Sequence, residues 1–164
     1  MTSYRIKSLT VALILVWALI GAGCASVSVQ KPVVIDFGAS QSEIAQSLAT
    51  SCAEIRERVI EPAQLPNVET QSQIDCIGFN YFGAPRLAEF VFADDALILT
   101  WILVEKDDLP ALEKAFIRDY GTPSFQDESI TGFHDAFAAV RKDIPEALYY
   151  SPSVAQLVVA RMTQ

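Results

Sequence analysis

Histidine is almost missing from this chain of 164 residues, in which His134 is the only one. Serine hydrolases, cysteine hydrolases and many metalloenzymes need one or more imidazoles to transfer protons or to bind the metal. His134 and Asp135 form one candidate acid–base pair, but a lone histidine of this kind is more often a solvent-facing strand residue. We therefore predict no catalytic residue, no metal site and no cofactor, and we do not expect an enzyme.

Glycine-rich phosphate loops are lacking too, because none of the seven glycines fits the spacing of a dinucleotide-binding or P-loop motif. Asp94–Asp95 and Glu105–Asp108 carry the oxygen atoms that calcium prefers as ligands. A predicted strand of eight residues separates the two groups by roughly 27 Å. We expect the first group in a turn and the second at a helix cap, without calcium.

Positive charge is scarce, with 12 lysines and arginines against 20 acids and a net charge of -8. The first 24 residues contain Arg5 and Lys7 and no acid, so removing them takes the net charge to -10. A domain this acidic repels nucleic acid and anionic lipid headgroups. We expect no nucleic-acid partner.

Long apolar runs are absent except at Leu9–Ile20, a stretch of about a dozen residues. A short basic segment, Met1–Lys7, precedes it, and the small residues Gly21–Gly23 follow. This is the layout of a secretory signal. The uncharged run Ser8–Gln30 reaches the length of about 20 residues that a membrane-spanning helix needs, so a single-pass protein with an uncleaved helix is an alternative.

The segment Ile20–Cys24 resembles the lipobox of bacterial lipoproteins, although Gly21 replaces the leucine usual in that family. The resemblance implies that Cys24 carries diacylglycerol, that the signal is cut before it, and that the new amine is acylated. Ala25, in place of aspartate, implies the outer membrane, with the domain facing the periplasm. An inner-membrane location, or ordinary cleavage near Gly23 and secretion, are the alternatives.

Cysteine is rare as well, and its count of three is odd. If Cys24 carries lipid, Cys52 and Cys76 are left to form one disulfide, as suits an oxidising compartment. Such a bridge stabilises a fold by about 3 kcal/mol in the chain-entropy model. The alternative is that both are small buried hydrophobic residues.

The organisation that follows is a signal peptide (1–23), a lipidated tether (24–38) and one domain (39–164). The tether could run into a first strand at Val33–Phe37. Ser40 and Glu43 fit a capping box, and apolar residues then recur at helical spacing, so we predict a helix from Ser40 to about Val59. The members of its apolar stripe are Ile44, Leu48, Cys52 and Ile55.

Alternating and apolar segments then predict strands. The first three are Asp75–Phe82, Leu87–Ala93 and Leu97–Val104, and two more are Phe133–Val140 and Ala155–Met162. A second helix begins after Asp108 and ends at Gly121. Runs of adjacent strands predict an α+β fold, a mostly antiparallel sheet with about two helices packed on one face. The segment FVFADDALILTWILV, with a helix and YGTP after it, is similar to small exported α+β domains of the SmpA/BLIP-like kind.

Aromatic residues at alternate strand positions, such as Phe79, Tyr81 and Phe90, predict the core of the sheet. Phe82 falls out of step with them, and with Tyr149 and Tyr150 it is our candidate for an exposed aromatic interaction patch. We expect a lipid-anchored, non-catalytic domain that binds a protein partner in the cell envelope. A periplasmic module that binds a small apolar or cationic ligand through the sheet aromatics is the alternative.

Overall fold

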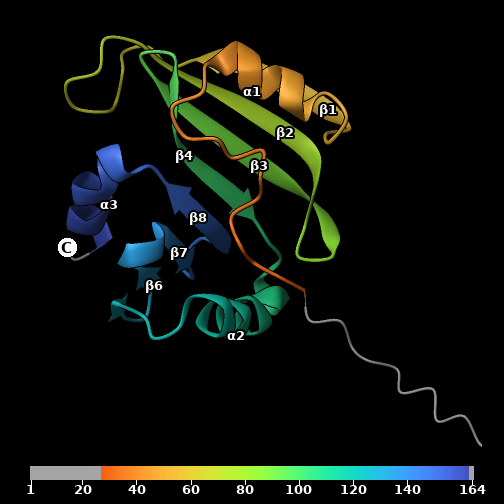
Figure 1. The fold of residues 1–164 in the computed structure, drawn as a ribbon, viewed down its shortest axis with the longest axis vertical. Coiled ribbons are helices and arrows are strands. Elements are labelled where there is room, and N and C mark those ends of the chain that lie inside the picture. The colour runs from red at the N-terminus through yellow and green to blue at the C-terminus, as the bar shows by residue number, and fades with distance from the viewer. Residues whose placement is uncertain (1–26, 163–164) are drawn as a thin grey trace, which may run out of the picture.

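An antiparallel sheet of eight strands organises the computed structural model, which describes residues 27–162 (Figure 1). Its strand order is β1-β2-β3-β4-β8-β7-β6-β5. The strands are β1 (Glu54–Val59), β2 (Gln71–Tyr81), β3 (Ala84–Ala93), β4 (Ala96–Leu103), β5 (Phe125–Gln126), β6 (Ile130–Phe133), β7 (Ala138–Arg141) and β8 (Glu146–Tyr150). The predicted α+β class and antiparallel sheet are confirmed. The predicted signal segment and Cys24 lie outside the described residues.

Three α-helices accompany the sheet: α1 (Gln41–Leu48), α2 (Leu109–Tyr120) and α3 (Ala155–Met162). Side chains of α1 and α2 belong to the larger hydrophobic core, on one face of the sheet. Ala155 and Val158 of α3 pack instead against Leu148 and Tyr150, on the other face (Figure 1). The structure therefore has two helices on one face of the sheet, as predicted, and in addition a third helix on the opposite face.

The capping box predicted at Ser40 is present, because the Glu43 amide donates to Ser40 and the Ser40 amide donates to the Glu43 carboxylate. The prediction that this helix continues to Val59 is wrong. Helix α1 ends at Leu48, and the amide of Ala53 donates to Ile77 of β2, which brings the chain to the edge of the sheet. Since Ile55 and Val59 are four residues apart, their spacing fits a helix and an alternating strand equally well.

The described part of the predicted tether, which begins at residue 27, belongs to the folded domain. Residues 27–37, which we call the strap, contain turns and no strand, so the strand predicted at Val33–Phe37 is wrong. Val29 and Ile35 are fully buried in the larger core. The folded domain therefore includes residues well before position 39.

The C-terminal third also differs from the prediction. The strand expected at Phe133–Val140 is broken by a 3-10 turn at His134–Ala136, and Phe137 adopts a left-handed φ of 51°. The strand expected at Ala155–Met162 is α3, whose start follows a turn in which Ser151 accepts a hydrogen bond from the Ser153 amide. Strand β8 was not predicted, because all five of its residues are buried and it shows no alternation.

The predicted disulfide between Cys52 and Cys76 is confirmed, with a Cα–Cα distance of 5.3 Å. It joins the segment after α1 to the buried side of β2. Asp94 and Asp95 occupy the β3–β4 turn, as predicted. Asp94 accepts hydrogen bonds from the amides of Glu69 and Thr70 at 3.0 and 2.8 Å, and Asp95 accepts one from Gln41.

Candidate binding groove

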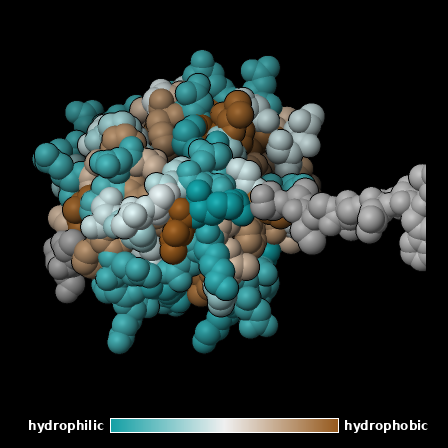
Figure 2. All heavy atoms as spheres, turned by 60° about the horizontal axis from the view of Figure 1, so that its bottom comes forward, coloured by the Kyte–Doolittle hydropathy of each residue, from teal (hydrophilic) through white to brown (hydrophobic). Residues whose placement is uncertain are grey.

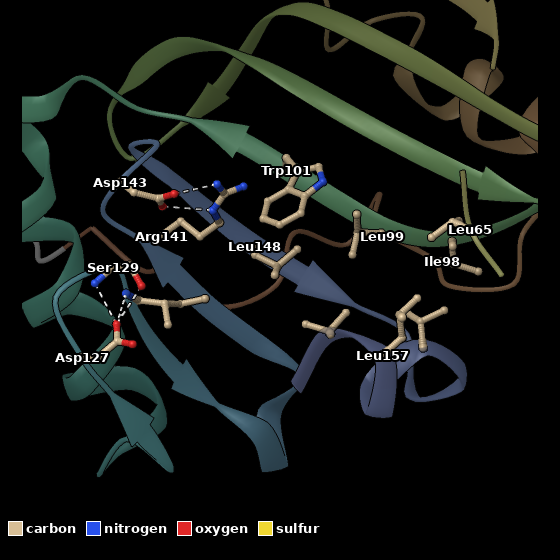
Figure 3. Close-up of a pocket in the computed structure, with 13 residues that line it drawn as sticks. Leu65, Ile98, Leu99, Trp101, Asp127, Ser129, Arg141, Asp143, Leu148 and Leu157 are labelled. Carbon is tan, nitrogen blue, oxygen red and sulfur yellow. Dashed lines mark hydrogen bonds and ion pairs between the residues drawn. The ribbon is translucent and has the colours of Figure 1, made fainter. Parts of the chain in front are cut away.

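The face of the sheet opposite α1 and α2 is covered only in part, and a cavity of about 390 Å³ lies there between the strands and α3 (Figure 3). We call this cavity the groove. Most of the side chains that line it are apolar: Leu65, Ile98, Leu99, Trp101, Ile130, Leu148, Val154, Leu157 and Val158. Its polar lining consists of Asp127, Ser129, Arg141 and Asp143. The groove therefore has an apolar body with charged residues at one end (Figure 3).

The register of the strands places these side chains together. Trp101 of β4 lies directly opposite Leu148 of β8, and alternate residues of a strand point to the same face. The pairing of β3 with β4 shifts between Val91 and Phe92, which leaves Ile98 without a partner in β3. As a result of this bulge, Ile98 and Leu99 both line the groove.

Arg141 is fixed above Trp101 at the polar end of the groove. Its guanidinium carbon lies 5.1 Å from the centre of the Trp101 ring, a cation–π contact. It donates to Glu146 at 2.7 Å and, from two nitrogens, to Asp143 at 3.2 and 3.1 Å. The ion pairs with Asp143 and Glu146 therefore hold the guanidinium in place over the indole ring.

Two partly or fully buried carboxyl groups, Glu146 and Glu89, lie on the same side of the sheet as Trp101. Glu146 is 5% exposed, and burial raises its pKa to about 7, although Arg141 opposes the shift. Glu89 lies directly opposite Trp101 in β3, and burial together with Asp75 raises the pKa of its carboxyl group. Both shifts favour the protonated form, and for Glu146 the change of charge falls near neutral pH.

The other acids of the groove are engaged in local structure. Asp127 accepts hydrogen bonds from the amides of Ser129 and Ile130 and from the Ser129 hydroxyl, and these bonds lower its pKa. The bond from Arg141 lowers the pKa of Asp143. Both carboxylates are thus ionised at neutral pH and hold the strand connections that border the groove.

The predicted aromatic patch of Phe82, Tyr149 and Tyr150 does not exist. Tyr149 and Tyr150 are fully buried and point to opposite faces of β8, as neighbours in a strand must. Tyr149 lies in the larger core, and Tyr150 packs against Phe137 on the groove side. Phe82 is half-buried in the β2–β3 turn, where its left-handed φ of 50° explains why it is out of step with Tyr81.

His134 and Asp135 lie in the 3-10 turn before β7, not on a strand as expected. His134 is half-buried, Asp135 is exposed, and neither lines the groove. Asp108 precedes α2 as predicted, but its side chain pairs with Arg86 at 2.5 Å and makes no cap hydrogen bond. Over residues 27–162, no group of three or more potential metal ligands is present.

The predicted core aromatics Phe79, Tyr81 and Phe90 are buried among one another and do not line the groove. Sequence reasoning missed the groove itself. The available signal was the apolar character of both faces of Leu97–Val104, which placed Leu99 and Trp101 on a second face without identifying what lay against them.

In the described part of the chain, no helix has the length and apolar character required to cross a membrane. Comparisons with protein-family models, with curated proteins and with solved structures give no match to this chain.

Proposed function

We propose that this protein is a lipid-anchored component of the cell envelope whose non-catalytic domain binds an apolar segment of a partner polypeptide in the groove. The observation that supports the binding role is an apolar cavity with Trp101 and Arg141 fixed at one end. Tryptophan and arginine are enriched among the residues that dominate binding energy at protein interfaces. The anchor rests on the lipobox-like segment Ile20–Cys24.

The surroundings of the groove resemble a protein interface. Its body is apolar, the half-exposed Asp143 lies at its border, and the partly exposed Glu89 lies on the adjoining strand β3. An apolar centre with a polar rim is the usual anatomy of such surfaces. The polar groups nearest to Trp101 form hydrogen bonds with one another. This arrangement suits the recognition of a partner by shape and apolar contact more than the chemical conversion of a substrate.

A small apolar ligand is the second candidate. A volume of about 390 Å³ falls in the range of roughly 300–1,000 Å³ typical of small-molecule pockets. The aromatics that first suggested such a ligand, Phe79, Tyr81 and Phe90, are core residues, so a ligand would contact Trp101 and α3 instead.

Photo-crosslinking in intact envelopes tests the binding role. We would place a photoreactive amino acid at Leu157, which lines the groove, and at Gln46, an exposed position on α1, as the matched control. We expect a discrete protein adduct from position 157 and none from position 46. Equal adducts from both positions would refute a protein site in the groove, and a lipid or other small adduct from position 157 would favour the second candidate.

Metabolic labelling with a palmitate analogue tests the anchor. The native chain should incorporate the label and Cys24→Ala should not, because the cysteine sulfur and the new amine both depend on that residue in the lipoprotein family. Equal labelling of the two chains would rule out lipidation at Cys24.

A further inference from the structure

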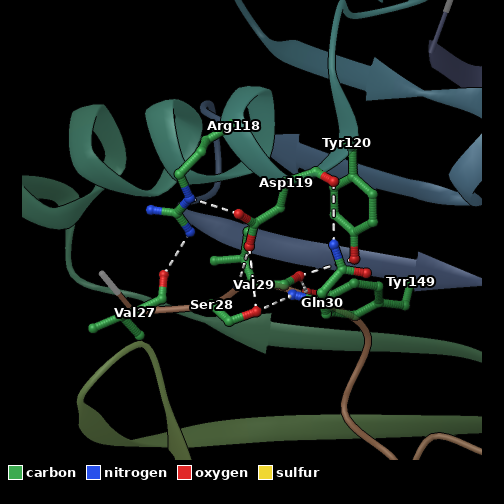
Figure 4. A network of polar contacts seen from close by, with 8 residues as sticks. All are labelled: Val27, Ser28, Val29, Gln30, Arg118, Asp119, Tyr120 and Tyr149. Atoms are coloured by element: carbon green, nitrogen blue, oxygen red, sulfur yellow. Dashed lines mark hydrogen bonds and ion pairs between the residues drawn. The ribbon is translucent and has the colours of Figure 1, made fainter. Parts of the chain in front are cut away.

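We infer that the strap holds the anchored domain directly against the bilayer, with the end that carries Val27 and the last turn of α2 facing the lipid headgroups. The inference rests on the proposed lipid at Cys24. It differs from the expectation of a tether, because the described residues after that cysteine are bound to the domain (Figure 4).

The first four described residues are held by the last turn of α2. The Asp119 carboxylate accepts hydrogen bonds from the Val29 amide at 2.9 Å and from the Ser28 hydroxyl at 3.3 Å. Arg118 donates to the Val27 carbonyl at 2.8 Å, and Gln30 donates to the Asp119 carbonyl at 3.1 Å. The Arg118 side chain also lowers the pKa of Asp119, which keeps the accepting carboxylate ionised.

A second set of contacts fixes the strap from inside the core. Val29 is fully buried, and its carbonyl accepts hydrogen bonds from Tyr149 at 2.7 Å and from Tyr120 at 2.9 Å. The Tyr149 hydroxyl is also bonded to that of Tyr81 at 2.8 Å. Detaching Val29 would break both of these hydrogen bonds to its carbonyl and expose a fully buried side chain, which is unfavourable. The strap is therefore a fixed part of the domain from residue 27 onward.

Covalent geometry then limits the distance to the lipid. Cys24 precedes Val27 by three residues, and three steps of about 3.8 Å span at most roughly 11 Å. Each headgroup layer is about 5–8 Å thick, and it separates the acyl chains from water. Most of the distance that the chain can span between Cys24 and Val27 is therefore used to cross the headgroup layer. Val27 must lie close to the membrane surface.

The side chains at this end suit such a position. Val27 and Ile117 are 45% and 40% exposed and belong to the few large hydrophobic residues that are exposed in residues 27–160. Arg118, which follows Ile117 in α2 and donates to the Val27 carbonyl, is 43% exposed. Figure 2 shows this end of the molecule, with hydrophobic residues scattered among hydrophilic ones. Such a mixed surface is suited to contact with headgroups more than to insertion between acyl chains.

This orientation leaves the groove open. Val29 belongs to the core on the side of α1 and α2, whereas the groove lies on the other face of the sheet. Helix α1 lies at the far end of the molecule from the start of the strap (Figure 1). The anchor and the proposed binding site therefore use different sides of one sheet.

Energy transfer to a headgroup dye tests the inference on the full, lipidated chain in zwitterionic phosphatidylcholine vesicles. Acylation of Cys24 is first established by mass spectrometry. A donor fluorophore is attached through a noncanonical amino acid at Lys114 on α2 or at Gln46 on α1, both exposed. We expect greater transfer from position 114 than from position 46.

The matched control inserts twelve Gly/Ser residues between Ser26 and Val27, which adds roughly 20 Å of average reach and should remove the difference between the two donors. Equal transfer from both positions in the native chain, or a difference that survives the insertion, would overturn the inference. A chain without acyl groups on Cys24 would instead remove the proposed anchor, and the orientation with it, at the first step.

Discussion

The two faces of the sheet are built for different tasks. On the face covered by α1, α2 and the strap, side chains such as Phe90, Phe116 and Tyr149 are fully buried. On the groove face, Leu99 and Trp101 of β4 remain partly exposed, and the cavity lies beside them, between the strands and α3. One face therefore supplies the stability of the fold, and the other keeps apolar surface available for binding.

The polar groups on the two faces of the sheet also differ. The helix-covered face contains the neutral hydroxyl cluster of Tyr81, Tyr120 and Tyr149, which binds the strap. The groove face contains the ionisable group of Arg141, Glu146 and Glu89 around Trp101. Because the first cluster holds two parts of the chain together and the second borders a cavity, substitutions on the two faces should separate stability from binding.

The largest loss of stability is expected for Phe116→Ala. The Phe116 ring is fully buried and lies 5.4 Å from Tyr120, 5.8 Å from Phe133 and 6.0 Å from Tyr149, measured between ring centres. Its removal should lower the free energy of unfolding by about 3–5 kcal/mol. Urea denaturation measures this, and a loss below that of a groove-side substitution such as Leu99→Ala would contradict the division between the faces.

Removal of the disulfide should have the next largest effect. Replacing Cys52 and Cys76 with serine frees a loop with a sequence separation of 24 and should lower the free energy of unfolding by about 3 kcal/mol. The same measurement on the native chain under reducing conditions is the control, and the two results should agree. An unchanged midpoint in both would show that the bridge adds nothing to the helix-covered face.

Glu146 should give the groove face a distinct pH dependence. Burial raises its folded-state pKa to about 7, above the ordinary value of 4.5, so the folded state binds the proton more tightly. The resulting stabilisation, at most about 3 kcal/mol, is fully present below pH 4.5, declines as the pH rises, and is lost once the pH has passed 7. The difference in unfolding free energy between the native chain and Glu146→Gln should follow this course, and a difference that is constant with pH would exclude it.

Asp119→Ala tests how firmly the strap belongs to the helix-covered face. It removes the acceptor for the Val29 amide and the Ser28 hydroxyl, and the free energy of unfolding should fall by about 2 kcal/mol. Hydrogen exchange at Val29 should become faster. Asp119→Asn keeps an acceptor oxygen and should lose less, so equal losses in the two variants would show that these bonds are not the cause.

The helix-covered face was largely predictable from the sequence. The capping box at Ser40, the glycine stop at Gly121 and the alternation of Phe79, Tyr81 and Phe90 are local signals. The pairing of Cys52 with Cys76 was predicted from a count of three together with the expectation that Cys24 carries lipid. Each of these features depends on neighbouring residues or on chemistry with few alternatives. None requires knowledge of how distant segments pack.

The groove face was not predictable in the same way. Residues 155–162 are apolar enough for a strand, and only their packing against Leu148 and Tyr150 makes them a helix. Tyr149 and Tyr150 follow directly after the buried Leu148, in a strand without alternation. The groove forms where β4 meets β8 and α3, and no local pattern reports that β4 packs beside segments that begin more than 40 residues later in the chain.

The smallest effect on stability and the largest on binding are expected from one substitution, Leu157→Glu in α3. Leu157 lines the groove and is only half-buried, so its replacement should change the free energy of unfolding by about 1 kcal/mol or less. A carboxylate there places a charge in the apolar wall, and burying it against a partner is unfavourable. Because position 157 is now substituted, the photoreactive amino acid is placed at Leu99, which also lines the groove. Crosslinking from Leu99 to the envelope partner should be lost in Leu157→Glu, whereas Gln156→Glu at the neighbouring exposed position should keep it. Retained crosslinking in Leu157→Glu would place the binding surface elsewhere, and a large loss of stability would show that the groove face carries the fold as well.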